Sequence, residues 1–472
     1  MRVVIAGCGR VGSQLATHLA HENHNVVIID RDPESFRRLE LPFNGLAIAG
    51  VAFDLEVLRE AGIEEADAFV ALTNYDNTNL MAAEIAKSIY GVPRVIARVY
   101  NPDKELTYRG MGIDYISGSA LLAQTFHREL TWRGALKHVE KPGGCEVLEI
   151  EVPPASRGCR LSEIRQAGKS RLMALTREEK PLYLDRDTAI LPGDRLLLAV
   201  NVKEFSWEDF AGALGIPLAG GPPQDVLGLG GASREERSGW RIVLAGCGRV
   251  GSQLAEMLSL DGYRVAVIDR DPRAGERLSK TFHGEFHTGM AFDLEVLEEA
   301  GIKEADAFAA LTNYDNTNLM AAEVARGIYG VKRVISRLFN PDKEETYQAL
   351  DIDFVCGTSL LAEQVMQRLL PHRPRILSRT ANNRVLVVEF EYPERRRAVR
   401  AGKLEGEEML RVGLVTRGGD TTVASPETVL RGGDTVVAAV LAPRLDRLRR
   451  LLAREGAPGS PRPLTLGAGT PT

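Results

Sequence analysis

Two short segments of the sequence have the glycine spacing that binds a phosphate group. Both carry the motif GxGxxG after a strand-like run, at Gly7, Gly9 and Gly12 and again at Gly246, Gly248 and Gly251. The first glycine permits a tight turn, the second lets backbone N–H groups approach a pyrophosphate, and the third allows a helix to pack closely on a strand. The phosphate then lies at a helix N-terminus, where unpaired N–H groups and the helix dipole favour an anion.

An aspartate follows each motif at the distance typical of a dinucleotide site. Asp30 lies eighteen residues after Gly12, at the end of the second apolar run, and Asp269 repeats this spacing. A carboxylate at this position can hold the hydroxyls of a ribose, which favours NAD(H) or ATP over NADP. Arg31 and Arg270 follow directly and leave binding of a 2′-phosphate open.

Arginines recur at the edge of the predicted sheet where ligands bind. Arg10 and Arg249 lie inside the glycine loops and are candidates to contact phosphate, while Arg98 and Arg337 end the fifth strand of their half. On spacing alone a surface salt bridge explains the latter pair equally well. Thr73-Asn74 and Thr312-Asn313 close strand four at the same edge, and for the following Asp76-Asn77 and Asp315-Asn316 we favour capping of the next helix.

The sequence repeats itself at an offset of 239 residues, which provides an internal control. The block ALTNYDNTNLMAAE at Ala71–Glu84 recurs letter for letter at Ala310–Glu323, so the chain contains a domain duplication and not a solenoid. The spacing of His18, His21 and His24 resembles a metal site, but their counterparts are Met257, Leu260 and Tyr263. No catalytic Ser/His/Asp set, carboxylate pair or Cys–His pair recurs in both copies, so we expect no catalytic and no metal site.

The five cysteines form no CxxC pair and indicate a reducing compartment. Cys8 and Cys247 lie inside the glycine loops, where a helix N-terminus can activate a thiol. The alternative, which we favour, is that a small side chain fits a tight turn.

Each half alternates strands with helices, which predicts a doubly wound parallel α/β sheet. In the first half the expected strands are Val3–Ala6, Asn25–Ile29, Leu46–Ala49, Ala68–Leu72, Val95–Val99 and Tyr115–Ile116. The expected helices are Ser13–Leu19, Leu55–Ala61, Asn79–Ile89 and Ser119–Leu130. The last of these is apolar enough to cross out of its sheet, and it and Thr358–Leu370 are candidate pairing surfaces or buried core helices.

A small α+β lobe is expected after each sheet. Val147–Val152 and Val385–Glu391 are β-rich, and each lobe ends in a Gly-Asp turn and a last strand. The predicted divisions are 1–131 and 240–370 for the Rossmann-like sheets and 140–211 and 380–453 for the lobes, with a Gly/Pro-rich linker at 212–239 and a disordered tail at 454–472.

Composition and hydropathy argue against several classes of protein. A net charge of -5 argues against a nucleic-acid binder. No run approaches the 18 apolar residues of a spanning helix. Because Met1 leads directly into a strand-like run, we expect no signal peptide. We therefore expect a cytoplasmic protein whose association with a membrane depends on a partner.

The tandem units resemble the RCK/KTN family. The resemblance rests on GCGRVG, on VVIID, on the run from Ala61 to Leu80 that recurs at Ala300–Leu319, and on a following lobe that ends in PGD. It covers about 2–202 and 241–440, and it implies a peripheral, ring-forming homo-oligomer (dimer or tetramer) that binds NAD(H) and adenine nucleotides, ATP or ADP, and gates a membrane potassium channel or transporter of the Trk type.

The resemblance also implies the ligand-contacting residues. They are Gly7, Gly9, Arg10, Val11, Gly12, Asp30, Thr73, Asn74 and Arg98 at one site and Gly246, Gly248, Arg249, Val250, Gly251, Asp269, Thr312, Asn313 and Arg337 at the other.

The sequence departs from the family pattern at two places in each copy. Gly50-Val51 and Gly289-Met290 stand where the family commonly has Gly-Asp. Gly118-Ser119 and Gly357-Thr358 stand where the last strand commonly ends in Glu. These changes leave the choice between NAD(H) and ATP open, as well as two alternative functions: an NAD-dependent oxidoreductase with duplicated cofactor domains, or a regulator of another cation transporter.

Overall fold

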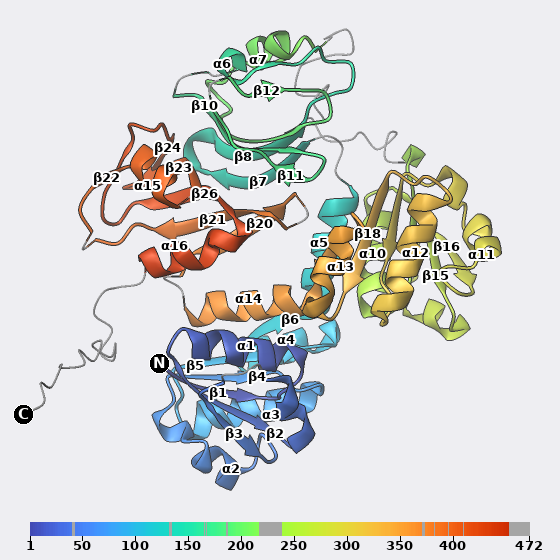
Figure 1. Cartoon of the computed structure of the whole chain (residues 1–472). Helices are drawn as coiled ribbons and strands as arrows, with labels where there is room; N and C mark the ends of the chain where they lie inside the picture. Colours follow the sequence, from blue (N-terminus) through green and yellow to red (C-terminus); the bar gives the residue numbers. More distant parts are fainter. Residues whose placement is uncertain are drawn as a thin grey trace, which may run out of the picture. The chain divides into compact units, whose positions relative to one another are not determined.

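The computed structural model describes residues 1–39, 43–131, 135–164, 166, 168–185, 187–216, 238–370, 373–381, 383–394, 396–408 and 410–452. The chain divides into two compact units, each assembled from two separate stretches of sequence. One unit contains residues 1–133 and 230–371, and the other contains residues 134–229 and 372–472. Figure 1 shows the elements of both units along the sequence.

The first unit contains two parallel sheets of six strands each. The first sheet has the order β3-β2-β1-β4-β5-β6 and is built from β1 (Arg2–Ala6), β2 (Asn25–Asp30), β3 (Leu46–Ala49), β4 (Ala68–Ala71), β5 (Arg94–Val99) and β6 (Asp114–Ser117). Its helices are α1 (Arg10–His21), α2 (Leu55–Glu60), α3 (Asp76–Glu84), α4 (Glu105–Gly110) and α5 (Gly118–Leu130). The order reverses between β2-β1 and β4, which creates a crevice at the carboxyl ends of β1 and β4.

The second sheet repeats this order as β16-β15-β14-β17-β18-β19. Its strands are β14 (Arg241–Ala245), β15 (Arg264–Asp269), β16 (Glu285–Thr288), β17 (Ala307–Ala310), β18 (Arg333–Leu338) and β19 (Asp353–Cys356). Its helices are α10 (Arg249–Leu260), α11 (Leu294–Glu299), α12 (Asp315–Gly327), α13 (Glu344–Ala349) and α14 (Gly357–Leu369). The predicted doubly wound parallel fold is therefore confirmed in both halves, and α4 and α13 are helices that the sequence analysis did not identify.

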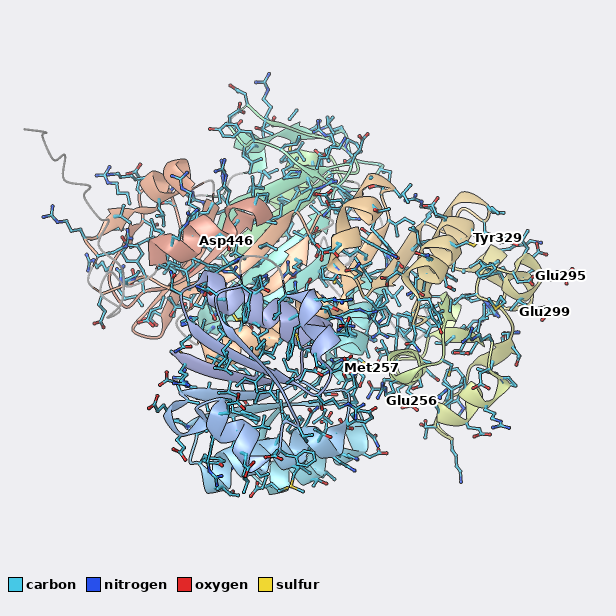
Figure 2. All side chains as sticks on the ribbon, turned by 60° about the horizontal axis from the view of Figure 1, so that its bottom comes forward. Glu256, Met257, Glu295, Glu299, Tyr329 and Asp446 are labelled. Atoms are coloured by element: carbon cyan, nitrogen blue, oxygen red, sulfur yellow. The ribbon has the colours of Figure 1, made fainter. Side chains whose placement is uncertain are left out.

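Local signals explain where the helices begin. The Asp54 carboxylate accepts a hydrogen bond of 2.8 Å from the N–H of Glu56 at the start of α2, and Asp293 does the same for Glu295 at 3.0 Å. Such caps satisfy N–H groups that have no partner within the helix. Figure 2 shows Glu295 near the start and Glu299 at the end of α11.

The last helix of each sheet packs on the other sheet. Leu122, Phe126 and Leu130 of α5 lie in one hydrophobic cluster with Leu254 and Leu258 of α10. In the reverse direction, α14 packs against α1 of the first sheet, as Figure 1 also shows.

Reciprocal hydrogen bonds fix the ends of these helices. The Arg94 guanidinium donates to the Leu369 carbonyl at 2.6 Å, and its counterpart Arg333 donates to the Leu130 carbonyl at 3.0 Å. The prediction that Ser119–Leu130 crosses out of its sheet is therefore correct. The two alternatives for this helix, a pairing surface or a buried core helix, both hold, because α5 is buried where it packs on the other half.

The second unit contains two small α+β lobes of the same topology. The first lobe has the sheet order β11-β10-β13-β8-β7, and the second, taken from its opposite edge, has the order β24-β23-β26-β21-β20. The first lobe comprises β7 (Ala135–Lys141), β8 (Cys145–Glu151), β9 (Cys159–Arg160), α6 (Leu161–Ile164), β10 (Ser170–Arg177), β11 (Lys180–Pro181), β12 (Ala189–Ile190), β13 (Arg195–Asn201) and α7 (Trp207–Leu214). The second comprises β20 (Arg375–Thr380), β21 (Val385–Glu391), β22 (Val399–Arg400), α15 (Ala401–Glu408), β23 (Leu410–Arg417), β24 (Asp420–Val423), β25 (Val429–Leu430), β26 (Thr435–Leu441) and α16 (Leu445–Leu452).

The Gly-Asp turns hold the same position in both lobes. Asp194 is buried and accepts hydrogen bonds from Arg177 at 2.7 Å and from the N–H of Leu191 at 2.8 Å. Asp434 does the same with Arg417 and Arg431. A buried carboxylate needs such partners, so the Gly-Asp sequence marks a structural turn.

The structure describes only a small part of the predicted linker and none of the predicted tail. Helix α7 extends to Leu214, so the first residues of the predicted linker are helical. Residues 217–237 and 453–472, which include the remaining linker and the predicted tail, lie outside the described residues. Among the helices described, none has the length and apolar character that crossing a bilayer requires.

Candidate functional site

The carboxyl edges of the two parallel sheets open into one cavity of about 1320 Å³. All the predicted ligand-contacting residues line it except Gly12 and Gly251. Residues from both halves, which are separated by some 239 positions in sequence, therefore share one space. A site for one small molecule usually occupies about 300–1,000 Å³, so this cavity has room for more than one such ligand.

The three glycines of each motif have different surroundings. A methyl group added at Gly7 would lie 2.8 Å from the backbone N of Thr73, and one added at Gly12 would lie 1.9 Å from the Gly7 carbonyl oxygen. At Gly9 it would meet no atom within 4 Å, although Gly9 lines the cavity. The corresponding distances in the second copy are 2.9 Å and 1.9 Å, with open space at Gly248. The first and third glycines thus serve packing, and the second leaves free space where a pyrophosphate would approach.

Backbone N–H groups orient the aspartate of each site. Asp30 accepts hydrogen bonds from the N–H of Cys8 at 2.7 Å and of Asp32 at 3.0 Å. Asp269 accepts equivalent bonds from Cys247 and Asp271 at the same distances. Each carboxylate is therefore fixed at the cavity wall, and its remaining lone pairs can accept from ligand hydroxyls.

The cysteines of the glycine loops are buried and unreactive. Cys8 and Cys247 have no exposed surface, and their thiols donate to the carbonyls of Ser35 and Ala274. Burial, with a smaller contribution from the neighbouring aspartate, raises the pKa of each thiol to about 11. The reactive-thiol alternative is wrong, because the thiolate required for reaction is disfavoured there.

Two buried asparagines, which nothing in the sequence pattern singled out, hold the segment after strand four. The Asn79 carbonyl oxygen accepts from the N–H of Thr73 at 2.9 Å and from its hydroxyl at 2.7 Å. The Asn79 amide nitrogen donates to the carbonyls of Thr73 at 3.1 Å and Arg98 at 3.0 Å. Asn318 repeats the network with Thr312 and Arg337. These asparagines fix the positions of the residues that line the cavity on either side of them.

The acidic residues after strand four do not cap their helices. Asp76 is the first residue of α3, and that helix has no side-chain cap. Its carboxylate instead accepts from the N–H groups of Tyr100 at 2.7 Å and Asn101 at 2.9 Å. Asp315 binds Phe339 and Asn340 in the same way. The capping prediction is wrong because the chain after strand five comes close enough to use these carboxylates.

Four arginines and two aromatic rings line the region shared by both halves. The Arg98 guanidinium lies 4.0 Å from the centre of the Tyr100 ring, and Arg249 of the opposite glycine loop lies 4.8 Å from the same ring. Arg337 and Arg10 lie 4.0 Å and 5.7 Å from the Phe339 ring. These distances fall within the range of cation–π contacts.

None of these four arginines forms an ion pair with a carboxylate of the described residues. The Nε atoms of Arg98 and Arg337 are buried without a hydrogen-bond partner in the same set. Burial, followed by the charges of Arg98 and Arg249, lowers the pKa of Arg337 to about 10, and burial lowers that of Arg98. The salt-bridge interpretation of Arg98 and Arg337 is therefore wrong. The arginines repel one another, and an anion in the cavity would relieve this repulsion.

The histidine triplet has no metal-binding arrangement. No group of His, Cys, Asp and Glu residues suited to a metal ion occurs in the described part of the chain. Figure 2 shows Met257, the counterpart of His18, next to Glu256 on α10.

The positions that depart from the family pattern lie at the cavity. Val51 and Met290 line it with side chains that are 42% and 40% exposed. Both side chains are uncharged. A methyl group at Gly118 would lie 3.7 Å from an Arg98 nitrogen. The absence of a carboxylate here is consistent with the unpaired state of Arg98.

Comparisons with known proteins agree with the fold. A family model described as the TrkA-N domain matches residues 3–118 and 242–358. The Trk system potassium uptake protein TrkA of Streptomyces coelicolor is 43% identical over 189 residues, which cover 40% of this chain and 85% of that protein. The protein of the same name from Azorhizobium caulinodans is 26% identical over 484 residues, which cover 96% of this chain and 98% of that protein.

A solved structure shares the fold over most of the length of the chain. The crystal structure of the GsuK RCK domain has a TM-score of 0.58 and 18% sequence identity, and the match covers 96% of this chain and 94% of that one. The GsuK channel bound to NAD gives the same TM-score at 19% identity, over 96% of this chain and 78% of that one. The resemblance drawn from the sequence motifs is confirmed: the chain belongs to the TrkA family of Trk system potassium uptake proteins and carries two TrkA-N domains in tandem.

Proposed function

We propose that this chain is a nucleotide-sensing regulatory subunit of a Trk-type potassium uptake system. It would bind NAD(H), ATP or ADP at both sheet edges, assemble as a homo-oligomer, and act from the cytoplasm on a membrane subunit. The observation that carries the proposal is the pair of intact glycine–aspartate edges that open into one arginine-lined cavity. We propose no catalytic residue.

The order of the strands suggests how a nucleotide lies at each edge. In the first half, β2 with Asp30 flanks β1 on one side, and β4 with Thr73 and Asn74 flanks it on the other. The adenosine ribose would lie against Asp30 and the phosphates at Gly9. The part of the nucleotide that extends beyond these phosphates would reach Asn74 and Arg98. The second edge provides the same positions.

The arginines connect the two edges. Arg249 belongs to the second glycine loop but lies against Tyr100 of the first half, and Arg10 lies against Phe339 of the second. A bound anion would therefore be held by arginines from both halves. Since a ligand shifts a conformational equilibrium only by its differential affinity for the two states, nucleotides of different charge would favour different arrangements of the halves. The exchanged helices α5 and α14 would transmit the change.

Nucleotide binding to the purified chain tests the site. We expect NADH, ADP or ATP to bind, and Asp30→Ala and Asp269→Ala each to weaken binding at their own edge by about tenfold, because each deletes a charged acceptor for ribose hydroxyls. The double variant should bind more weakly at both edges. Isothermal titration calorimetry measures the stoichiometry, and Asp54→Ala, which removes a helix cap outside the cavity lining, controls for stability. Unchanged affinity in Asp30→Ala, Asp269→Ala and the double variant would exclude these ligand contacts.

Two further measurements separate the alternatives. Turnover of NADH with a panel of small substrates at ordinary enzyme rates would favour an oxidoreductase. Potassium uptake by cells that express the Trk membrane subunit, with and without this chain, tests the partner. If the chain copurifies with another cation transporter and leaves potassium uptake unchanged, it regulates that transporter instead.

A further inference from the structure

Among the cavity-lining positions that differ between the two edges, one changes the hydrogen bonding of a lining amide. Tyr100 follows strand β5 of the first half, and its counterpart after β18 is Phe339. Each ring lies 4.0 Å from the arginine of its own strand. The difference between the edges at this position is therefore one hydroxyl group.

The Tyr100 hydroxyl determines the orientation of a neighbouring amide. It donates a hydrogen bond of 3.0 Å to the side-chain oxygen of Asn74. An asparagine amide has one oxygen that accepts and one NH₂ group that donates. With its oxygen engaged by Tyr100, Asn74 presents its NH₂ group as the part of the amide that remains for a ligand.

The matching amide at the second edge lacks this constraint. Asn313 lines the cavity like Asn74, but Phe339 has no hydroxyl to donate to it. The Asn313 amide can therefore rotate and offer either its oxygen or its NH₂ group. The first edge is arranged to donate, and the second can both donate and accept.

The sheet order gives the part of the ligand that these amides meet. Asn74 follows β4, on the opposite side of β1 from Asp30, so it lies beyond the phosphates when the first ribose occupies Asp30. In a nucleoside di- or triphosphate this region holds terminal phosphate oxygens, which only accept. In a dinucleotide it holds the second ribose, whose hydroxyls also donate.

We propose that Tyr100 makes the two edges select different nucleotides. The first edge takes an adenine nucleoside di- or triphosphate, and the second takes a dinucleotide such as NAD(H). The inference rests on the proposed nucleotide binding and adds to it the ligand class of each edge. The cross-half arginines support the assignment, because Arg249 lies 4.8 Å from the Tyr100 ring whereas Arg10 lies 5.7 Å from the Phe339 ring.

Variants that isolate one edge provide the test. In the full-length chain, Asp269→Ala leaves the first edge and Asp30→Ala leaves the second, and ATP and NADH are titrated into each by calorimetry. We expect the preference for ATP over NADH to be about tenfold greater at the first edge, as loss of one well-placed hydrogen bond implies. Tyr100→Phe should reduce the preference at the first edge by about this factor, and Phe339→Tyr should raise it at the second.

Tyr115→Phe is the matched control. It removes a tyrosine hydroxyl bonded to Glu105 in the same sheet but outside the cavity lining, and the preference should stay unchanged. Equal preferences at the two edges, or no effect of Tyr100→Phe, would overturn the inference while nucleotide binding stands. Failure of the unmodified chain to bind either nucleotide would overturn the proposed function and this inference together.

Discussion

Gly9 and Gly12 belong to one motif, yet a methyl group at each would meet different surroundings. At Gly12 it would lie 1.9 Å from a carbonyl oxygen, and at Gly9 it would enter open space. We expect Gly12→Ala to destabilise the fold by about 1–3 kcal/mol through overpacking. Gly9→Ala should leave the unfolding free energy nearly unchanged and weaken nucleotide binding, because its methyl group occupies the space of the pyrophosphate.

Thermal unfolding and NADH or ADP titration check both expectations. Gly251→Ala and Gly248→Ala repeat the pair in the second half, where the surroundings are the same. Equal loss of stability from Gly9→Ala and Gly12→Ala would contradict the separation of packing from binding.

At this scale the sequence predicted many residues that line the cavity and missed others that hold them in place, for a physical reason. The glycines and Asp30 were predictable because their roles depend on local backbone geometry and fixed spacing. Asn79 appears in the sequence as an ordinary helical residue, and only the approach of strand β5 shows that it binds the carbonyl of Arg98. The function of Asp76 was mispredicted for the same reason.

Among the elements, the exchanged helices make each sheet depend on the other half of the chain. Phe126 of α5 is fully buried in the cluster of the second sheet. Phe126→Ala should therefore destabilise the second sheet by about 3–5 kcal/mol, the usual range for this change in a core. Hydrogen exchange should show the larger loss of protection in β14 and β17 and a smaller loss in β1 and β4.

Val365→Ala on α14 is the reciprocal test, since Val365 belongs to the cluster of the first sheet. The pattern of exchange should reverse. Loss of protection confined to the half that contains the substitution would contradict the exchange.

Most strands were predicted within a residue or two because each is an apolar run between turn residues. Strands β7 and β20 were missed, since they carry charged residues on a face covered only when the lobes pair, as Lys141 shows by its contact with Glu389. The convergence of Arg10 on Phe339 could not be predicted, because no local pattern encodes which residues of the two halves meet.

At the scale of the whole molecule, the paired lobes make stability depend on pH. Glu149 is buried. The imidazole of His138 lies 2.9 Å from the Glu149 carboxylate and 2.5 Å from the hydroxyl of Ser378 in the other lobe. Burial alone would raise the pKa of Glu149, but the hydrogen bond and charge of His138, with Arg195 and Thr380, hold it below the usual range. A carboxyl whose pKa is depressed in the folded state stabilises the protein above its unfolded pKa, about 4.3, and this contribution is lost as pH falls through the folded pKa.

We therefore expect the melting temperature of the lobes to decrease when the pH is lowered past about 4.3, the ordinary pKa of a glutamate. Glu149→Gln should flatten this dependence in a calorimetric series from pH 6 to lower values. Glu140→Gln is the control, since the Glu140 side chain is 69% exposed. An identical pH dependence in the unmodified chain and Glu149→Gln would exclude Glu149 as its source.

The exchange of α5 and α14 also has a consequence for how the protein is made. When α5 leaves the ribosome, the second sheet that buries it is not yet made, and the face of α1 that binds α14 stays uncovered until α14 is made, 239 residues after α5. At about 5–20 residues per second, that interval lasts roughly 10–50 s. Until the second sheet is made, the nascent first half exposes an apolar helix and an apolar groove, which fit the groove and helix of a second nascent chain. Translation speed and chaperone supply would thus decide whether a chain closes on itself or pairs with a neighbour on the same messenger.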